Sequence, residues 1–148
     1  PGAQQLVRVD IQPLLTARTE VPAAAFTHGR RVERWQRIAV ASAKQCGRAV
    51  VPDVLPPCSL QAFLGAGLQG PALILVEPAA ASPGARAWPL GDIPPTATLL
   101  VGPEGGWAED ELALALATGG SPLTLGPRTL RADAAAIVAL SVLQYVWR

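Results

Sequence analysis

The sequence has few of the residues that most often carry metal and nucleophilic chemistry. His28 is the only histidine, which excludes a His-rich metal site and leaves a single residue that could serve a histidine-based catalytic triad. Cys46 and Cys58 are the only cysteines, and they form no CxxC pair. This usage favours unpaired thiols in a reducing compartment over a metal or redox role, so we expect no metal and a cytoplasmic location.

Long hydrophobic runs are also absent. Gly, Pro or a charged residue interrupts each apolar stretch well short of the roughly 20 residues that a membrane span needs, and no signal-peptide pattern opens the chain. Half of the 148 residues are hydrophobic and the net charge is +1, which predicts one soluble domain with a buried core. The chain begins at Pro1 rather than Met, so it is expected to be processed, renumbered or a fragment.

Two glycine-bearing loops stand out in what the chain does contain. The strand-like run Leu99–Val101 leads into Gly102–Gly106, and a helix then opens with acidic residues in its first turn, where they suit the positive end of the helix dipole. A second loop, Leu125–Arg131, again lies between a short apolar strand and an apolar helix. Two such loops at the ends of two strands resemble the rim of an α/β ligand site.

Neither loop has the pattern of a nucleotide phosphate cradle. The GxxxxGK[ST] and GxGxxG spacings are missing, and the single lysine, Lys44, lies elsewhere. A ligand with little net negative charge, held by backbone N–H and C=O groups, fits these loops better. The simpler alternative, that the glycines only make tight turns, stays open for each loop alone. For Arg128 and Arg131 two placements also stay open: the side chains face one shared cleft, or they are solvated at the surface. Asp133 is expected as an N-cap or first-turn carboxylate of the last helix.

Periodicity predicts alternating strands and helices. A strand is expected within 6–11, loops over 16–29 and 77–96, and a helix over 31–46 that ends at Gly47. Residues 49–52 are expected to form a short strand or an extended exit from that helix. The remaining elements are a short helix at 60–68, buried strands at 72–76 and 98–101, a last strand at 123–125, and helices at 107–118 and 133–147. This order indicates a parallel sheet with helices on both faces. Because the last helix is apolar on nearly every side, we expect burial by the core and by a partner subunit.

Positive charge is concentrated on the helix over 31–46 and its ends. Six of the twelve basic residues lie within residues 30–48, with Glu33 as the only acid among them. A solvated helix face is one explanation, and contact with RNA phosphates is the one that this imbalance favours. The six are Arg30, Arg31, Arg34, Arg37, Lys44 and Arg48.

Three motifs in order resemble the RsmE family. They are Glu33–Ile38 with Ala43–Arg48 and Val51-Pro52, then Gly102–Trp107, then Leu125–Ala134. The segment Ile11–Thr19 is also similar to the stretch that precedes the arginine-rich helix. The resemblance extends over nearly the whole chain and is weakest at 54–96. Thr129, Ala132 and Asp133 depart from the Ile, Thr and Glu that the family prefers.

The resemblance implies an enzyme of the SPOUT superfamily that methylates uridine N3 in 16S ribosomal RNA. It implies a SPOUT-type α/β fold with a C-terminal deep trefoil knot over about 72–148, S-adenosylmethionine bound in the knot loops, and a homodimer packed through knot helices. Its substrate would be the rRNA of the 30S subunit. The family's N-terminal PUA-like RNA-binding barrel is not in residues 1–148, so the chain is expected to be a methyltransferase domain shortened at its N-terminus.

Roles for individual residues follow from this resemblance and the chemistry of N3 methylation. Arg131, with Arg128 in reserve, is expected to stabilise the uridine anion, and Glu104 to accept the imide proton. The arginines expected to bind RNA are Arg30, Arg31, Arg34, Arg37 and Arg48. The residues expected to line the cofactor, mostly through backbone atoms, are Val76, Glu77, Gly102, Pro103, Gly105, Gly106, Leu125, Gly126 and Leu130.

Two rival functions stay open at this point. A catalytically impaired fragment or paralogue would act as an RNA-binding or dimerisation module and bind no S-adenosylmethionine. An unrelated nucleotide-binding domain would bind ATP or NAD instead.

Overall fold

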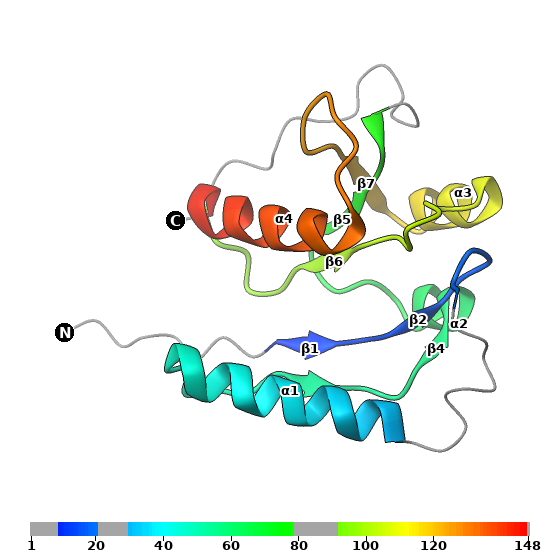
Figure 1. The fold of residues 1–148 in the computed structure, drawn as a ribbon. Coiled ribbons are helices and arrows are strands. Elements are labelled where there is room, and N and C mark those ends of the chain that lie inside the picture. The colour runs from blue at the N-terminus through cyan, green and yellow to red at the C-terminus, as the bar shows by residue number, and fades with distance from the viewer. Residues whose placement is uncertain (1–8, 21–29, 79–91, 148) are drawn as a thin grey trace. The chain divides into compact units, whose positions relative to one another are not determined.

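The structure, a computed structural model, describes residues 9–20, 30–78 and 92–147 (Figure 1). Their contacts divide the chain into two compact units. The N-terminal unit comprises residues 9–15 and 30–59, and the C-terminal unit comprises residues 16–20, 60–78 and 92–147. The expected loops over 16–29 and 77–96 and the strand within 6–11 lie partly outside the described residues.

One long helix and two short parallel strand pairs form the N-terminal unit. The helix α1 (Arg30–Cys46) confirms the helix predicted over 31–46, and Gly47 follows it with φ 71°. Strand β1 (Asp10–Ile11) pairs with β3 (Asp53–Val54), and β2 (Leu14–Leu15) pairs with β4 (Cys58–Ser59). Cys46 and Cys58 are both free thiols, and burial raises the pKa of the Cys58 thiol.

Of the two alternatives predicted for 49–52, the strand is wrong and the segment leads out of α1, because the strand pairing starts only after Pro52. Asp53 N–H donates to the Val9 carbonyl and Leu55 N–H to the Ile11 carbonyl, whereas Pro52 has no N–H to give. Gln36 of α1 holds this point from the helix side. Its Nε2 donates to the Pro52 carbonyl at 3.0 Å, and its Oε1 accepts from Val54 N–H at 2.8 Å.

A three-stranded parallel sheet in the order β6-β5-β7 organises the C-terminal unit. All four residues of the central strand β5 (Ala72–Leu75) are buried, as the continuous apolar run at 72–76 predicted. Strand β6 (Thr98–Leu100) also lies where it was predicted. The parallel sheet of the predicted fold class is thereby confirmed.

The last strand was predicted at 123–125 and is instead β7 (Gly120–Leu123). Its Gly-Ser-Pro-Leu sequence has no apolar alternation to signal a strand. Pairing with β5 requires Gly120, since a Cβ there would lie 2.5 Å from Ile74 Cδ1. Pro122 is tolerated because β7 ends the row of described strands and pairs on one side only.

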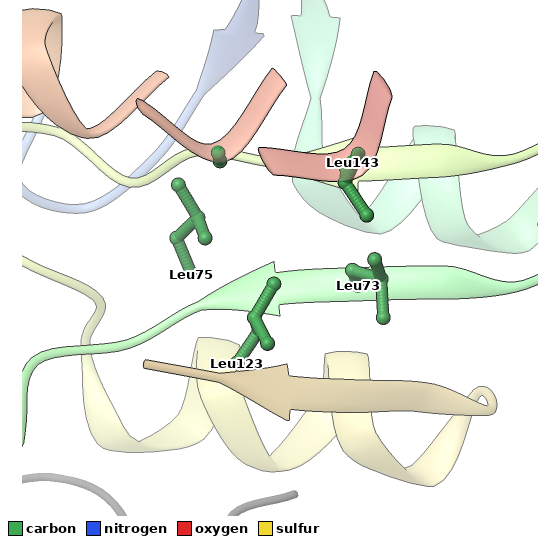
Figure 2. Packing of buried hydrophobic residues seen from close by; sticks show 5 residues of the cluster. Leu73, Leu75, Leu123 and Leu143 are labelled. Atoms are coloured by element: carbon green, nitrogen blue, oxygen red, sulfur yellow. The ribbon is translucent and has the colours of Figure 1, made fainter. Parts of the chain in front are cut away.

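Helices cover both faces of this sheet. On one face, Leu73, Leu75 and Leu123 pack against Ala139 and Leu143 of α4 (Ala132–Val146), as Figure 2 shows. Each such leucine contributes roughly 1.5–3 kcal/mol by leaving water. The alternate strand residue Ile74 lies on the other face, beside the carbonyl of the buried Ala115 in α3 (Glu109–Ala117).

The helices α2 (Leu60–Gly65) and α3 fall within the ranges predicted for them, and α4 begins and ends one residue earlier than predicted; no helix end differs from its prediction by more than three residues. Burial of α4 was expected by the core and by a partner subunit. Within this chain the core buries one face of the helix, and apolar side chains elsewhere on it stay exposed. Ile137, Leu140 and Tyr145 remain 68%, 52% and 67% exposed. Across the described residues, no helix has both the length and the apolar character to cross a membrane.

Candidate functional site

The three parallel strands end at one edge of the sheet, and a cavity of about 420 Å³ lies there. The loop after β5 (Val76–Pro78), the loop after β6 (Val101–Ala108, the first loop) and the loop after β7 (Thr124–Arg131, the second loop) contribute its walls. Apolar walls come from Leu75, Val76, Val101, Leu112, Leu125 and Ala135. The volume lies within the range of small-molecule sites, which is roughly 300–1,000 Å³.

The first loop is held by hydrogen bonds from several directions. Gly106 N–H donates to the Pro103 carbonyl at 2.9 Å, which closes a turn, and Gly106 has φ 70°, a conformation that suits glycine. Trp107 Nε1 donates to the Leu75 carbonyl at 2.9 Å, linking this loop to the end of β5. Gly102 makes room for that indole, because a Cβ there would lie 3.1 Å from the ring.

The start of α3 fixes the other end of the first loop. Ala108 has no side-chain acceptor, and Glu111 instead reaches back so that its Oε2 accepts from Ala108 N–H at 3.2 Å. Its Oε1 accepts from Ala17 N–H at 2.7 Å. The turn Thr16–Glu20 is therefore tied to this loop, and Arg18 Nη1 donates to the Gly105 carbonyl at 2.7 Å.

The second loop presents its side chains to solvent. Every residue from Gly126 to Arg131 is exposed. Arg131 is the N-cap residue of α4, and its Nε lies 3.5 Å from Asp133 Oδ1, with the two side chains 88% and 71% exposed. An ion pair between two such exposed side chains contributes about 0–1 kcal/mol to stability, so Asp133 holds the Arg131 guanidinium only weakly. Asp133 lies in the first turn of α4, as expected.

The structure brings most of the predicted site residues to this one cavity. Arg128, Arg131 and Glu104, which were assigned to catalysis, all line it, and all three are exposed. Gly126 does not line the cavity. The predicted cofactor residues that do line it are Val76, Glu77, Gly102, Pro103, Gly105, Gly106, Leu125 and Leu130.

Sequence reasoning missed two contributors to the site. Trp107 was noted only as the aromatic residue of a motif, and its indole supports the first loop. Arg18 was named only as part of the segment Ile11–Thr19, which is similar to the family. It lines the cavity although it lies 87 positions before Gly105, whose carbonyl it contacts. Membership in the Ile11–Thr19 motif was the only signal for it. Among the described residues, no group of three or more potential metal ligands comes together.

The arginines predicted to contact RNA lie in the N-terminal unit. Arg30, Arg31, Arg34 and Arg37 are exposed on α1, and Arg48, also exposed, follows the helix. The opposite face of α1 carries apolar side chains and borders a hollow of about 580 Å³ against the β1 and β3 strands. The predicted face residues Trp35, Ile38, Ala39, Ser42 and Cys46 all line this hollow.

A family model described as an RNA methyltransferase domain matches residues 5–144. Among curated proteins, the ribosomal RNA small subunit methyltransferase E of Synechocystis is 39% identical over 133 residues, which cover 88% of this chain and 42% of that protein. Its namesake in Bacillus subtilis is 30% identical over 138 residues, covering 90% of this chain and 54% of that protein. The chain thus spans about half the length of these relatives.

Solved structures give the same result. A Legionella pneumophila protein with bound cofactor SAM superposes with a TM-score of 0.81 at 37% identity, covering 93% of this chain and 55% of that one. The ribosomal RNA small subunit methyltransferase E of Neisseria gonorrhoeae, bound to S-adenosylmethionine, gives 0.74 at 34% identity, with coverage of 94% and 55%.

Proposed function

Because the chain belongs to the RNA methyltransferase domain family, we propose that it methylates N3 of a uridine in 16S ribosomal RNA, with S-adenosylmethionine as methyl donor. The predicted resemblance to the RsmE family is confirmed by the relatives of that name. The observation that carries the proposal is the cavity at the carboxyl edge of the sheet, which has a glycine loop on one side and the exposed Arg128 and Arg131 on the other.

The cavity fits a cofactor with an apolar base and little net charge. Its walls are aliphatic side chains and bare backbone, and the glycines at 102, 105 and 106 leave the first loop's main chain accessible. A side chain at Gly102 would meet Trp107, and one at Gly106 would force φ 70° on an L-residue. The residues that would hold the cofactor are Val76, Glu77, Gly102, Pro103, Gly105, Gly106, Leu125 and Leu130; Gly126, which does not line the cavity, is left out.

The reaction asks two things of the residues around the cofactor. The bound cofactor supplies an electrophilic methyl group on a sulfonium centre. Uridine N3 carries a proton and lies on the Watson–Crick edge, so the base must be unpaired and its N3 proton must leave. Glu104, exposed at the cavity, would accept that proton. The Arg131 guanidinium, with Arg128 of the same cavity in reserve, would stabilise the resulting anion at O2 or O4.

RNA binding is assigned to the arginine stripe of α1. Arg30, Arg34 and Arg37 recur at helical spacing, with Glu33 as the acid of the first turn. Exposed guanidinium groups at that spacing suit successive phosphates. The substrate would be the rRNA of the 30S subunit, which would place the protein in the cytoplasm.

We assign residues 72–148 to the family's deep trefoil knot and α4 to a homodimer interface. Ile137, Leu140 and Tyr145 support the second assignment, because exposed apolar side chains of this size on one helix usually meet a partner. Replacing Ile137 and Leu140 by Glu would convert a dimer into monomers in analytical ultracentrifugation. A wild-type chain that sediments as a monomer would contradict this interface.

Titration calorimetry with S-adenosylmethionine, followed by methyl transfer to 30S particles, tests the whole proposal. Binding together with transfer at uridine N3 is the expected result. RNA binding without heat from S-adenosylmethionine would favour the RNA-binding or dimerisation module. A melting temperature raised by ATP or NAD, and not by S-adenosylmethionine, would favour an unrelated nucleotide-binding domain.

A further inference from the structure

Arg18 lies along the first loop of the candidate site rather than in open solvent. Its Nη1 donates to the Gly105 carbonyl at 2.7 Å. Its Cβ, Cδ and Cγ lie 3.3, 3.4 and 3.8 Å from where a Cβ on Gly105 would be. Gly105 therefore leaves just enough room for the arginine stem to lie against the backbone.

The peptide between Gly105 and Gly106 is held at both of its polar ends. Its carbonyl accepts from Arg18, and its N–H donates to the Pro103 carbonyl at 2.9 Å. A peptide flanked by two glycines turns more easily than any other, because neither residue has a Cβ to restrict φ and ψ. Among the hydrogen bonds of the described residues, the one to the Pro103 carbonyl would be left to oppose that rotation if Arg18 were removed.

The turn that carries Arg18 is itself anchored. Ala17 N–H donates to Glu111 Oε1 at 2.7 Å, while Glu111 Oε2 accepts from the N–H of Ala108, the residue before α3. Within the turn, Thr19 N–H donates to the Thr16 carbonyl at 3.1 Å, and Thr16 N–H donates to Thr19 Oγ1 at 3.0 Å. The Arg18 backbone is thus fixed relative to α3 before its side chain reaches the loop.

We propose that Arg18 is a positioning residue of this site, whose guanidinium fixes the Gly105–Gly106 peptide so that the first loop is formed before its ligand arrives. What the loop binds rests on the function proposed above. A loop ordered in advance loses less conformational entropy on binding, and this difference appears as affinity. Because Arg18 acts through the loop, it should affect cofactor binding far more than the methyl-transfer step.

The test compares Arg18→Ala and Arg18→Lys with Lys44→Ala, a matched loss of one positive charge on the exposed surface of α1. S-adenosylmethionine affinity is measured by calorimetry, and exchange of the Gly106 amide hydrogen by NMR in the ligand-free chain. We expect Arg18→Ala to weaken binding about tenfold, as the loss of a charge-assisted hydrogen bond would, and to speed Gly106 exchange. Arg18→Lys should recover part of the affinity, and Lys44→Ala should match the wild-type affinity for S-adenosylmethionine. In Arg18→Ala, kcat at saturating cofactor should change less than twofold.

A second variant tests the contact from the other side. Gly105→Ala would crowd the Arg18 stem. Because Arg18→Ala removes Cγ, Cδ and the guanidinium but keeps Cβ, the effect of Gly105→Ala on affinity should be smaller in an Arg18→Ala background than in wild type, although not abolished. Effects that add would overturn the proposal, and so would wild-type affinity and exchange in Arg18→Ala. Full rescue by Lys would indicate a long-range charge effect and would also overturn it. If the wild-type chain binds no S-adenosylmethionine, the proposed function fails, while faster Gly106 exchange in Arg18→Ala would still support the positioning role.

Discussion

The two loops that face each other across the cavity are built in opposite ways. The first loop is fastened by the hydrogen bonds that Trp107 and Arg18 donate, by the bond that Ala108 N–H donates to Glu111, and by its own turn at Gly106. The second loop exposes every residue from Gly126 to Arg131. In the proposed function, the fastened loop supplies a fixed surface for the cofactor and the proton acceptor Glu104, and the exposed loop supplies the guanidinium groups that meet the RNA base.

Arg131→Ala should show the difference between the roles of the two loops most strongly. Removing the guanidinium should lower methyl transfer to 30S particles by more than a hundredfold, since hydrogen bonds to a developing charge are worth about 3 kcal/mol. S-adenosylmethionine affinity should stay within a few-fold, because the first loop is untouched. Rates come from single-turnover assays and affinities from calorimetry. Unaltered activity would remove Arg131 from the mechanism.

The glycines of the two loops make a matched pair. Gly102→Ala places a methyl group 3.1 Å from the Trp107 indole and should displace the ring that supports the first loop. Gly126→Ala meets nothing within 4 Å but must adopt φ 115°, so it carries backbone strain alone, about 1–2 kcal/mol. We expect Gly102→Ala to weaken cofactor binding at least tenfold and Gly126→Ala less than threefold. The reverse order would contradict the division of labour between the loops.

Trp107→Phe tests one fastening of the first loop by itself. Phenylalanine keeps an aromatic ring but has no N–H for the Leu75 carbonyl, so about 1 kcal/mol of stability should be lost. In a chain of this length that corresponds to a fall in melting temperature of roughly 2–4 °C. Differential scanning calorimetry measures it, with Trp147→Phe, on α4's C-terminal side, as the comparison. A melting temperature equal to wild type would show that the indole hydrogen bond is not needed.

Asp133→Asn should have the smallest effect. The partner Arg131 is 88% exposed, and such pairs contribute about 0–1 kcal/mol. Chemical unfolding should therefore shift by no more than a few tenths of a kcal/mol, and S-adenosylmethionine affinity should not change. A loss of activity comparable with that of Arg131→Ala would mean that this carboxylate orients the guanidinium.

Local patterns in the sequence predicted the helices and the two strands β5 and β6, because burial there leaves a periodic or continuous apolar signal. The sequence placed the last strand two to three residues too far along the chain, at 123–125, since Gly120 and Pro122 of β7 are selected by the fit against β5 and not by any local preference. Arg18 was missed for a related reason. Its partner, the Gly105 carbonyl, lies far along the chain, and a backbone acceptor leaves no trace in the sequence.

The glycine loops were identified from the sequence because glycine itself marks a close approach or a positive φ. The structure adds what each glycine is for: Gly102 admits an indole, Gly105 admits an arginine stem, and Gly106 turns the chain. The exposed face of α4 was anticipated from its even apolar composition. The sequence did not indicate which of its side chains remain exposed, and the structure identifies Ile137 and Tyr145 as the most exposed of them.

The order β6-β5-β7 also governs when this fold can form during translation. The strand that seals one flank of β5 is synthesised last of the three, some forty-five residues after it. Until then the nascent polypeptide presents an apolar ribbon with open amide and carbonyl groups, a surface prone to pairing with other chains. The sheet of the C-terminal unit can therefore be completed only once residues 120–123 have been synthesised.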